Sequence, residues 1–168
     1  MNKQTKTARE NPGTIEVNQF FQSQGWKPFP FQKKTWQAYG EGKSGLIHAP
    51  TGTGKTFAVW APPLIEWMNQ GKLQKKRPAR LKVLWITPLR ALVEDTNRSL
   101  TELVEGLQLP WTIESRSGDT TGSRKASQRK KFPTALVTTP ESLSLLLSYP
   151  ETRESFSELE TVIVDEWH

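Results

Sequence analysis

The stretch that decides the fold is "GLIHAPTGTGKTFAVW", residues 45–60. A short apolar run, 44–49, precedes the glycines, and a longer apolar run, 54–68, follows them. Glycines let backbone N–H groups approach phosphate oxygens closely, and the start of the following helix favours negative charge. The stretch therefore predicts a buried strand, a phosphate-binding loop and a helix, which Pro62-Pro63 must kink or split.

The loop predicts a site for ATP and Mg²⁺. Its pattern places Lys55 at the terminal phosphates and the Thr56 hydroxyl on Mg²⁺. Ala49 stands where the strict pattern has glycine, and a bare Gly-Lys-Thr also arises by chance. The strand before and the helix after argue against chance. The expected nucleotide-binding residues are Thr51, Gly52, Thr53, Gly54, Lys55 and Thr56.

An acidic pair follows the last apolar run, "VIVDE" at 162–166. A nucleotide-bound Mg²⁺ needs a carboxylate at a strand end, and Asp165 offers one. Glu166, one residue further, is suited to polarise the attacking water. The alternative is an acidic strand end on the surface, which is common. With the phosphate loop upstream, we expect Lys55, Asp165 and Glu166 to be catalytic and Thr56 and Asp165 to bind the metal.

The remaining pattern alternates apolar strands with amphipathic helices. This alternation predicts an α/β fold, a parallel sheet covered by helices on both faces. Ligands of such sheets bind at the carboxyl ends of the strands, where the notable residues of this chain lie. The expected strands, besides 44–49, are 81–87, 111–115, 134–139 and 161–166, and the expected helices, besides 54–68, are 14–24, 30–39, 89–107 and 141–147.

Composition limits the class of protein. The chain has 168 residues and no cysteine, which excludes disulfides, thiolate metal sites and a cysteine nucleophile. No apolar stretch approaches the roughly 20 residues that span a bilayer, so a cytoplasmic protein is expected. Residues 1–13 are polar and are expected to form a flexible tail. Trp60, Trp67 and Trp85 lie inside apolar elements and are expected in the core.

The net charge of +6 is unevenly distributed. Residues 1–140 carry 22 Lys and Arg and 10 Asp and Glu, whereas residues 141–168 carry one Arg and seven acids. Two basic clusters, 72–82 and 123–131, fit polyanion binding. Each cluster is equally consistent with a solvated loop.

Four short motifs, in order along the chain, carry a family resemblance. "PTGTGKT", "TPLRAL", "VTTPESL" and "VDEWH" resemble the first RecA-like lobe of a superfamily 2 DEXH-box helicase of the large-helicase-related branch. Residues 26–64 are similar to bacterial ligase-associated DNA helicases. The resemblance implies a RecA-like P-loop NTPase fold. It also implies an ATP-dependent DNA helicase or translocase, active in DNA repair alongside a DNA ligase or nuclease.

The resemblance also implies individual roles. Gln32 corresponds to a glutamine that pairs with both the donor and the acceptor of the adenine edge, although a lone glutamine is more often a solvent-facing helix residue. The other motifs imply contacts to sugar and phosphate, so nucleic-acid binding should be largely independent of sequence. The implied nucleic-acid-binding residues are Thr87, Pro88, Arg90, Arg116, Gly118, Asp119, Thr139, Pro140 and Glu141.

The chain departs from the family after the acidic motif. The resemblance implies a helicase core of two lobes that bind ATP between them. It also implies that the strand carrying the next motif inserts between the phosphate-loop strand and the acidic strand. We therefore expect residues 14–168 to form an incomplete lobe, truncated after the Walker B strand, with a gap beside Asp165. By itself this chain is expected to fold poorly and to be catalytically inactive. The alternatives are an RNA helicase fragment, another P-loop class such as a small-molecule kinase, or a non-catalytic nucleic-acid-binding module.

Overall fold

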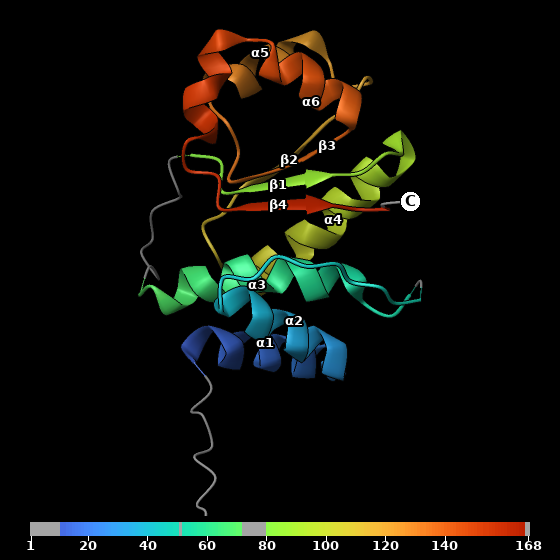
Figure 1. Ribbon diagram of the computed structural model, residues 1–168, viewed down its shortest axis with the longest axis vertical. Helices are drawn as coiled ribbons and strands as arrows, with labels where there is room; N and C mark the ends of the chain where they lie inside the picture. The colour runs from blue at the N-terminus through green and yellow to red at the C-terminus, as the bar shows by residue number, and fades with distance from the viewer. Residues whose placement is uncertain (1–10, 51, 72–79, 167–168) are drawn as a thin grey trace, which may run out of the picture.

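A computed structural model describes residues 11–50, 52–71 and 80–166 of the chain. Helices lie on both sides of one central sheet (Figure 1). In the described ranges no helix is long and apolar enough to cross a membrane. The elements are α1 (Pro12–Ser23), α2 (Pro30–Gly40), α3 (Lys55–Asn69), β1 (Val83–Ile86), α4 (Arg90–Gly106), β2 (Ile113–Arg116), α5 (Gly122–Lys130), β3 (Ala135–Thr138), α6 (Pro140–Leu147), the 3₁₀ helix η1 (Pro150–Phe156) and β4 (Thr161–Val164).

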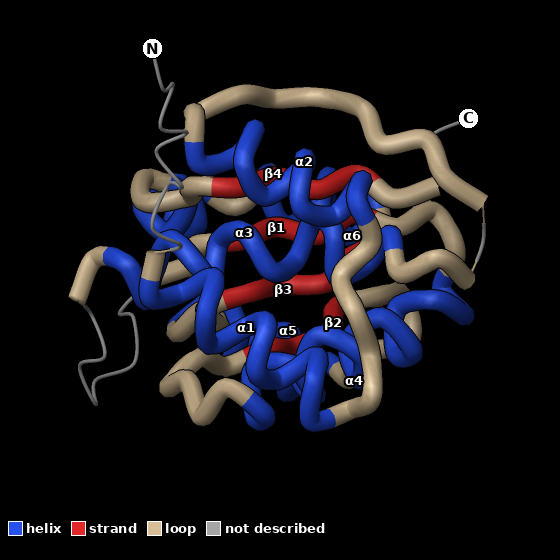
Figure 2. The backbone as a smooth tube through the Cα atoms, turned by 90° about the horizontal axis from the view of Figure 1, so that it is seen from below, coloured by secondary structure: helices blue, strands red, loops and turns tan. Residues whose placement is uncertain are grey.

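The sheet is parallel throughout. Its four strands lie in the order β2-β3-β1-β4, which Figure 2 shows through the layer of α1, α2 and α3. Helices α1 to α4 lie on one side of the sheet, and α5 and α6 lie on the other (Figure 1). The predicted α/β class, with helices on both faces of a parallel sheet, is confirmed.

The larger core lies between the sheet and helices α1 to α4. Trp60, Trp67 and Trp85 are buried in it, as predicted, and the Trp60 indole N–H donates to the carbonyl of Leu100 at 3.1 Å. Pro62-Pro63 is buried inside α3. The two prolines do not split the helix, which continues to Asn69.

The prediction of a strand over residues 44–49 is wrong. The segment is an extended loop that runs along the outer side of β4 (Figure 2), and Leu46 is 82% exposed. A cavity of about 620 Å³ separates Ser44, Gly45, Leu46 and Ile47 from residues 160–163. A strand needs a hydrogen-bonded neighbour, and this segment lies across the cavity from β4, so no ladder forms between them.

The edge of β4 that faces this cavity is open. The N–H of Thr161 donates to Lys82 and that of Asp165 donates to Ile86, so alternate residues of the strand bond to β1. In a parallel ladder the residues between them, Val162 and Val164, direct their backbone groups to the other side. Among the described residues no strand pairs with this edge. The open edge fits the gap that the resemblance leads us to expect beside Asp165.

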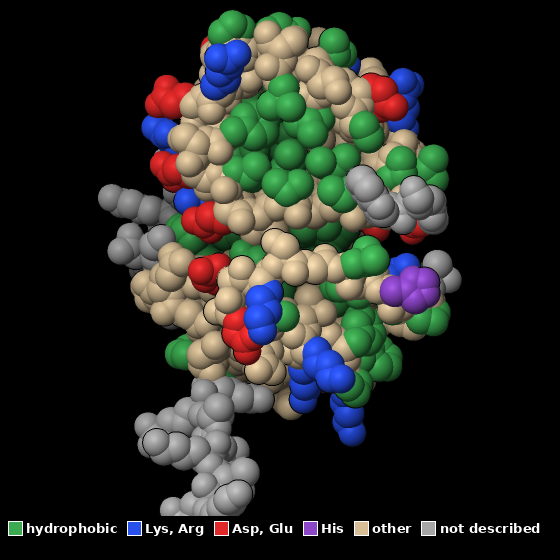
Figure 3. All heavy atoms as spheres, viewed as in Figure 1, with side chains coloured by type: hydrophobic (Ala, Val, Ile, Leu, Met, Phe, Trp, Pro, Cys, Tyr) green, Lys and Arg blue, Asp and Glu red, His purple; other side chains and the backbone are tan. Residues whose placement is uncertain are grey.

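The face of β4 that looks toward α6 is also exposed. Val162 and Val164 stand in register with Leu84 and Ile86, which belong to the smaller core under α6, yet they are 54% and 46% exposed. Hydrophobic side chains gather in a broad patch on this side of the sheet (Figure 3). The smaller core is therefore less completely covered than the larger one.

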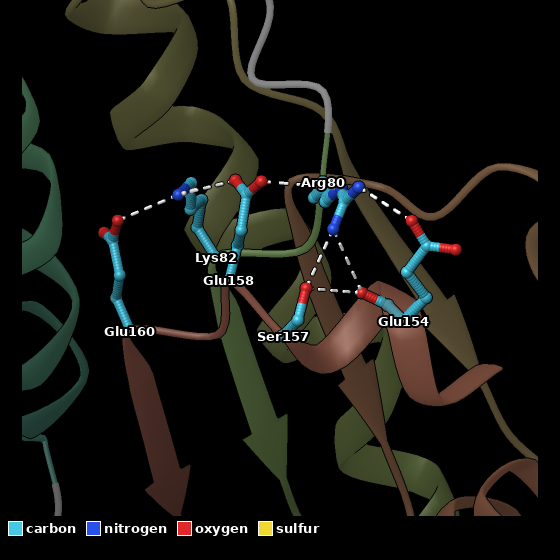
Figure 4. Close-up of polar contacts among 6 residues, drawn as sticks. All are labelled: Arg80, Lys82, Glu154, Ser157, Glu158 and Glu160. Atoms are coloured by element: carbon cyan, nitrogen blue, oxygen red, sulfur yellow. Dashed lines mark hydrogen bonds and ion pairs between the residues drawn. The ribbon is translucent and has the colours of Figure 1, made fainter.

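An ionic network lies at the amino ends of β1 and β4, the end of the sheet away from the predicted site (Figure 4). Lys82 donates to Glu158 at 3.2 Å and to Glu160 at 2.9 Å, and its side chain is only 11% exposed. Arg80 bonds to Glu154 at 2.8 Å and to Glu158 at 3.4 Å. Residues 72–79 of the first basic cluster lie outside the described ranges. The cluster's described members bind carboxylates of the chain itself.

We expect Lys82→Met to destabilise the fold by about 1–2 kcal/mol, between the values typical of exposed and buried ion pairs. Burial opposes the charge of Lys82, but the hydrogen bonds and charges of Glu160 and Glu158 outweigh it and raise its pKa. This stabilisation is therefore fully present below the ordinary pKa of lysine and is lost as the pH rises through the raised value. Urea denaturation at neutral pH measures the effect, with exposed Lys130→Met as the matched control. Equal stability of the two variants would contradict it.

Candidate nucleotide and nucleic-acid site

Two glycines give the phosphate loop its shape. Gly52 and Gly54 have φ values of 76° and 79°, a left-handed conformation that other residues rarely adopt. Gly54 is the N-cap of α3, so Lys55 is the first residue of the helix. The first N–H groups of a helix lack intrahelical partners and attract anions. Thr51 lies outside the described residues, and the Thr53 hydroxyl donates to the carbonyl of Pro50 at 2.7 Å.

Gln32 contacts this loop directly. Its amide nitrogen donates to the carbonyl of Gly54 at 2.9 Å, and its amide oxygen accepts from the N–H of Phe29 at 2.8 Å. The side chain is only 2% exposed, so Gln32 is not the solvent-facing residue of the alternative interpretation. Gln32, in the first turn of α2, thus joins the start of that helix to the phosphate loop. Its contact with adenine stays a prediction.

The acidic pair follows β4 directly. The N–H of Glu166 donates to Oδ1 of Asp165 at 3.0 Å, and Glu166 has a left-handed φ of 49°. Residues 167–168, the remainder of the acidic motif, lie outside the described ranges. The start of α3 and the end of β4 lie on the same side of the molecule (Figure 1). The fold therefore brings the phosphate loop and the acidic pair to one end of the sheet.

The oxygens of Thr56 and Asp165 suit Mg²⁺, which prefers hard oxygen ligands. Within the described ranges no group of three or more His, Cys, Asp and Glu could hold a metal ion. Mg²⁺ bound here would therefore take most of its ligands from phosphate and water, as it commonly does at nucleotide sites. The residue types fit the ion.

The predicted nucleic-acid residues follow β1, β2 and β3 at the same end of the sheet. Thr87 and Thr139 are fully buried, and Thr139 caps α6 by accepting from the N–H of Ser142 at 3.4 Å. The described structure shows no hydrogen-bond partner for the Thr87 hydroxyl. The exposed members of the predicted set are Pro88, Arg90, Gly118, Asp119, Pro140 and Glu141.

Arg90 is a cation of this surface, and Lys125 donates to the carbonyl of Gly118 nearby at 3.0 Å. The Arg90 guanidinium packs over Gly118, where a β-carbon would come within 2.8 Å of it, and lies 3.8 Å from the carboxylate of Asp119. The pKa of Glu141 is lowered by its own backbone N–H, by the Thr139 hydroxyl and by the charge of Arg90. Arg90 is thus near two carboxylates, and a phosphate that binds it must compete with them.

The structure places Arg116 away from this surface, in contrast to the expectation. The side chain is 4% exposed and donates to the carbonyl of Lys125 at 3.1 Å and to the amide oxygen of Gln128 at 3.3 Å, both on α5. Burial and the charge of Arg129 lower its pKa. Its position at the end of β2 directs it under α5, a helix that the apolar pattern of the sequence does not indicate.

Sequence reasoning missed two contacts of α2 near the site. The Trp36 indole N–H donates to the carbonyl of Phe57 at 3.3 Å, and the Tyr39 hydroxyl lies 2.7 Å from the hydroxyl of Thr161 on β4. The helical spacing of Gln32, Trp36 and Tyr39 is the signal that could have indicated a shared face.

The model of the DEAD/DEAH box helicase family matches residues 29–168. An ATP-dependent helicase Lhr-Core of Methanocaldococcus jannaschii is 36% identical over 149 residues, which are 83% of this chain and 18% of the relative. An Lhr helicase and probable uracil glycosylase of Mycolicibacterium smegmatis is 38% identical over 154 residues, which are 84% of this chain and 10% of the relative.

The fold agrees with these sequence matches. The structure of Mycobacterium smegmatis helicase Lhr bound to single-stranded DNA and AMP-PNP superimposes with a TM-score of 0.70 and 33% identity. The match covers 89% of this chain and 19% of that one. The chain therefore spans less than a fifth of the length of each of these relatives.

Proposed function

Because the chain belongs to the DEAD/DEAH box helicase family, we propose that it is the ATP-binding and nucleic-acid-binding part of an ATP-dependent DNA helicase. Residues 14–168 are then part of one RecA-like lobe. The observation that carries the proposal is that the glycine-shaped loop before Lys55 and the acidic end of β4 lie on the same side of the molecule (Figure 1).

Each half of the site has a chemical role in this proposal. The loop N–H groups and Lys55 bind the phosphates, while Thr56 and Asp165 hold the ion. Mg²⁺ neutralises the charge that develops during phosphoryl transfer. Glu166 orients and polarises the attacking water. The resemblance also assigns adenine to Gln32, whose amide is buried in this structure and bonded to Phe29 and Gly54.

The proposed nucleic-acid surface consists of the exposed residues around Arg90 together with the start of α6. The capped N-terminus of α6 and the guanidinium of Arg90 favour phosphate oxygens. DNA is proposed as the substrate because the solved Lhr relative is bound to single-stranded DNA. A role in DNA repair beside a ligase or nuclease is proposed from the ligase-associated resemblance alone.

The test compares ATP hydrolysis with single-stranded DNA and with single-stranded RNA of the same sequence. It uses a two-lobe polypeptide in which residues 1–168 are extended by the rest of their RecA-like lobe and by a second lobe, because the resemblance implies that ATP is clamped between two lobes. We expect DNA to raise the hydrolysis rate more than RNA does. Stronger stimulation by RNA would make the protein an RNA helicase.

A non-catalytic binding module is the second candidate, because α5 adds a basic surface. Arg124, Lys125, Arg129 and Lys130 lie on this helix, and Lys131 follows it. Binding through such a surface depends steeply on salt and is indifferent to nucleotide. Salt-dependent DNA binding that ATP leaves unchanged, without ATP hydrolysis, would favour the module over the helicase.

A further inference from the structure

Through one face, helix α2 contacts the phosphate loop, the first turn of α3 and the amino end of the strand that leads to Asp165. Gln32, Trp36 and Tyr39 are four and three residues apart, a spacing that places side chains on the same side of a helix. Their polar atoms bond to three different places: the carbonyl of Gly54 in the loop, the carbonyl of Phe57 in the first turn of α3, and the hydroxyl of Thr161 on β4.

The contact with β4 links segments 122 residues apart in the chain. Tyr39 and Thr161 both line the cavity of about 620 Å³ beside β4, so their hydrogen bond is a direct link across it. Burial raises the pKa of Tyr39 to about 12; the hydrogen bond with Thr161 opposes this shift, and the charge and hydrogen bond of Glu66 add to it. Either hydroxyl can be the donor of this bond.

Gln32 and Tyr39, at the two ends of this face, bond to different parts of the fold. Gln32 fixes the carbonyl of Gly54, the residue that caps α3 immediately before Lys55. Thr161 is the first residue of β4, the short strand that leads to Asp165. Because one rigid helix holds both points, it limits the movement of the loop relative to the acidic pair.

We propose that α2 is a brace between the phosphate loop and the acidic strand, and that Tyr39 is a positioning residue for hydrolysis through its bond to Thr161. The inference rests on the proposed function, since it assigns Tyr39 to the ATP-hydrolysing site. Tyr39 touches neither phosphate nor water in this role. It acts by holding β4, and with it Asp165 and Glu166, in place relative to Lys55.

The test is a double-mutant cycle of Tyr39→Phe and Thr161→Val in the two-lobe polypeptide, with kcat and KM for ATP measured under DNA stimulation. We expect each single variant to lower kcat by about three- to tenfold, the range that one lost hydrogen bond commonly produces. The double variant should be no slower than the slower single variant, because both changes remove the same bond. Binding of AMP-PNP should stay within about twofold of wild type, since the loop itself is unchanged.

The chain supplies a matched control in its other tyrosine. Tyr149 packs under Arg129, 4.3 Å from its ring, and Tyr149→Phe keeps that ring contact while removing a hydroxyl far from the loop in sequence. It should leave kcat unchanged. The proposal would be overturned if Tyr39→Phe had the kcat of wild type, or if kcat of the double variant fell by the product of the two single-variant factors. Absence of ATP hydrolysis in the wild type would instead overturn the proposed function.

A purely structural role for Tyr39 predicts a different pattern. Loss of fold stability would reduce the active fraction, so kcat and the AMP-PNP binding capacity would fall together. Measuring the number of AMP-PNP sites per chain separates the two cases. A fall in site number that accounts for the whole loss of kcat would also overturn the proposal.

Discussion

Lys55→Ala is expected to lower the rate of ATP hydrolysis by at least about 100-fold, the loss typical of removing one preorganised charge-stabilising group. Lys55 is the first residue of α3 and follows the left-handed Gly54, so its side chain begins at the N-terminus of the helix, where the backbone N–H groups lack intrahelical partners. Alanine keeps the helix but removes the charge that neutralises the terminal phosphates. Steady-state hydrolysis and ATP affinity of the two-lobe polypeptide measure the effect, and both should fall.

The control for this change is Arg98→Ala. Arg98 is a cation on the solvent side of α4, with 82% of its side chain exposed. Its removal changes the net charge as Lys55→Ala does, so a general electrostatic effect on ATP would appear in both variants. Wild-type turnover in Lys55→Ala would remove the chemical basis of the proposed function.

The parts of the fold that the sequence predicted correctly are those with local signals. The strands β1, β3 and β4 are compact apolar runs, and α4 has a regular apolar stripe. The segment 44–49 has the same apolar character but forms no strand, because a strand depends on a neighbour that pattern alone does not supply. Composition therefore indicates that a segment can be a strand, while pairing decides whether it is one.

The helix α5 shows the opposite error. Its residues Gly122–Lys130 are polar and basic, so no apolar period marks them, and the sequence pattern predicts only a basic cluster there. The available signal was Thr121, whose hydroxyl accepts from the N–H of Arg124 at 3.4 Å as an N-cap. Arg116 is buried by its contacts with α5, so its burial could not be predicted without that helix.

The candidate site was predictable where chemistry needs a fixed spacing and was not where it depends on contacts between distant segments. The residues Gly52 to Thr56 and the pair Asp165 and Glu166 follow local patterns. The bond from Gln32 to Gly54 and the bond from Tyr39 to Thr161 join elements that only the fold brings together. The ion pairs of Lys82 with Glu158 and Glu160 also join segments distant in sequence, so this member of a basic cluster stabilises the fold.

Glu166→Gln is expected to separate ATP binding from ATP hydrolysis. A positioned general base contributes about 10²- to 10⁴-fold to a reaction rate, so hydrolysis should fall by that range. The amide keeps the size of the side chain, and the N–H of residue 166 can still donate to Asp165. The Mg²⁺ and phosphate contacts assigned to Asp165, Thr56 and the loop are therefore retained, and ATP should bind as tightly as in wild type. Rapid-quench hydrolysis and ATP binding at equilibrium measure the two quantities.

The comparison with Lys55→Ala makes this expectation specific. Loss of Lys55 weakens the ground-state complex, whereas loss of the Glu166 carboxylate acts only when water attacks, so only the second variant should accumulate bound, intact ATP. Glu102→Gln, an exposed change on α4, controls for the loss of one negative charge. If Glu166→Gln turns over ATP at the wild-type rate, the base must be another group. If it instead loses ATP binding together with hydrolysis, the Glu166 carboxylate belongs to the binding site.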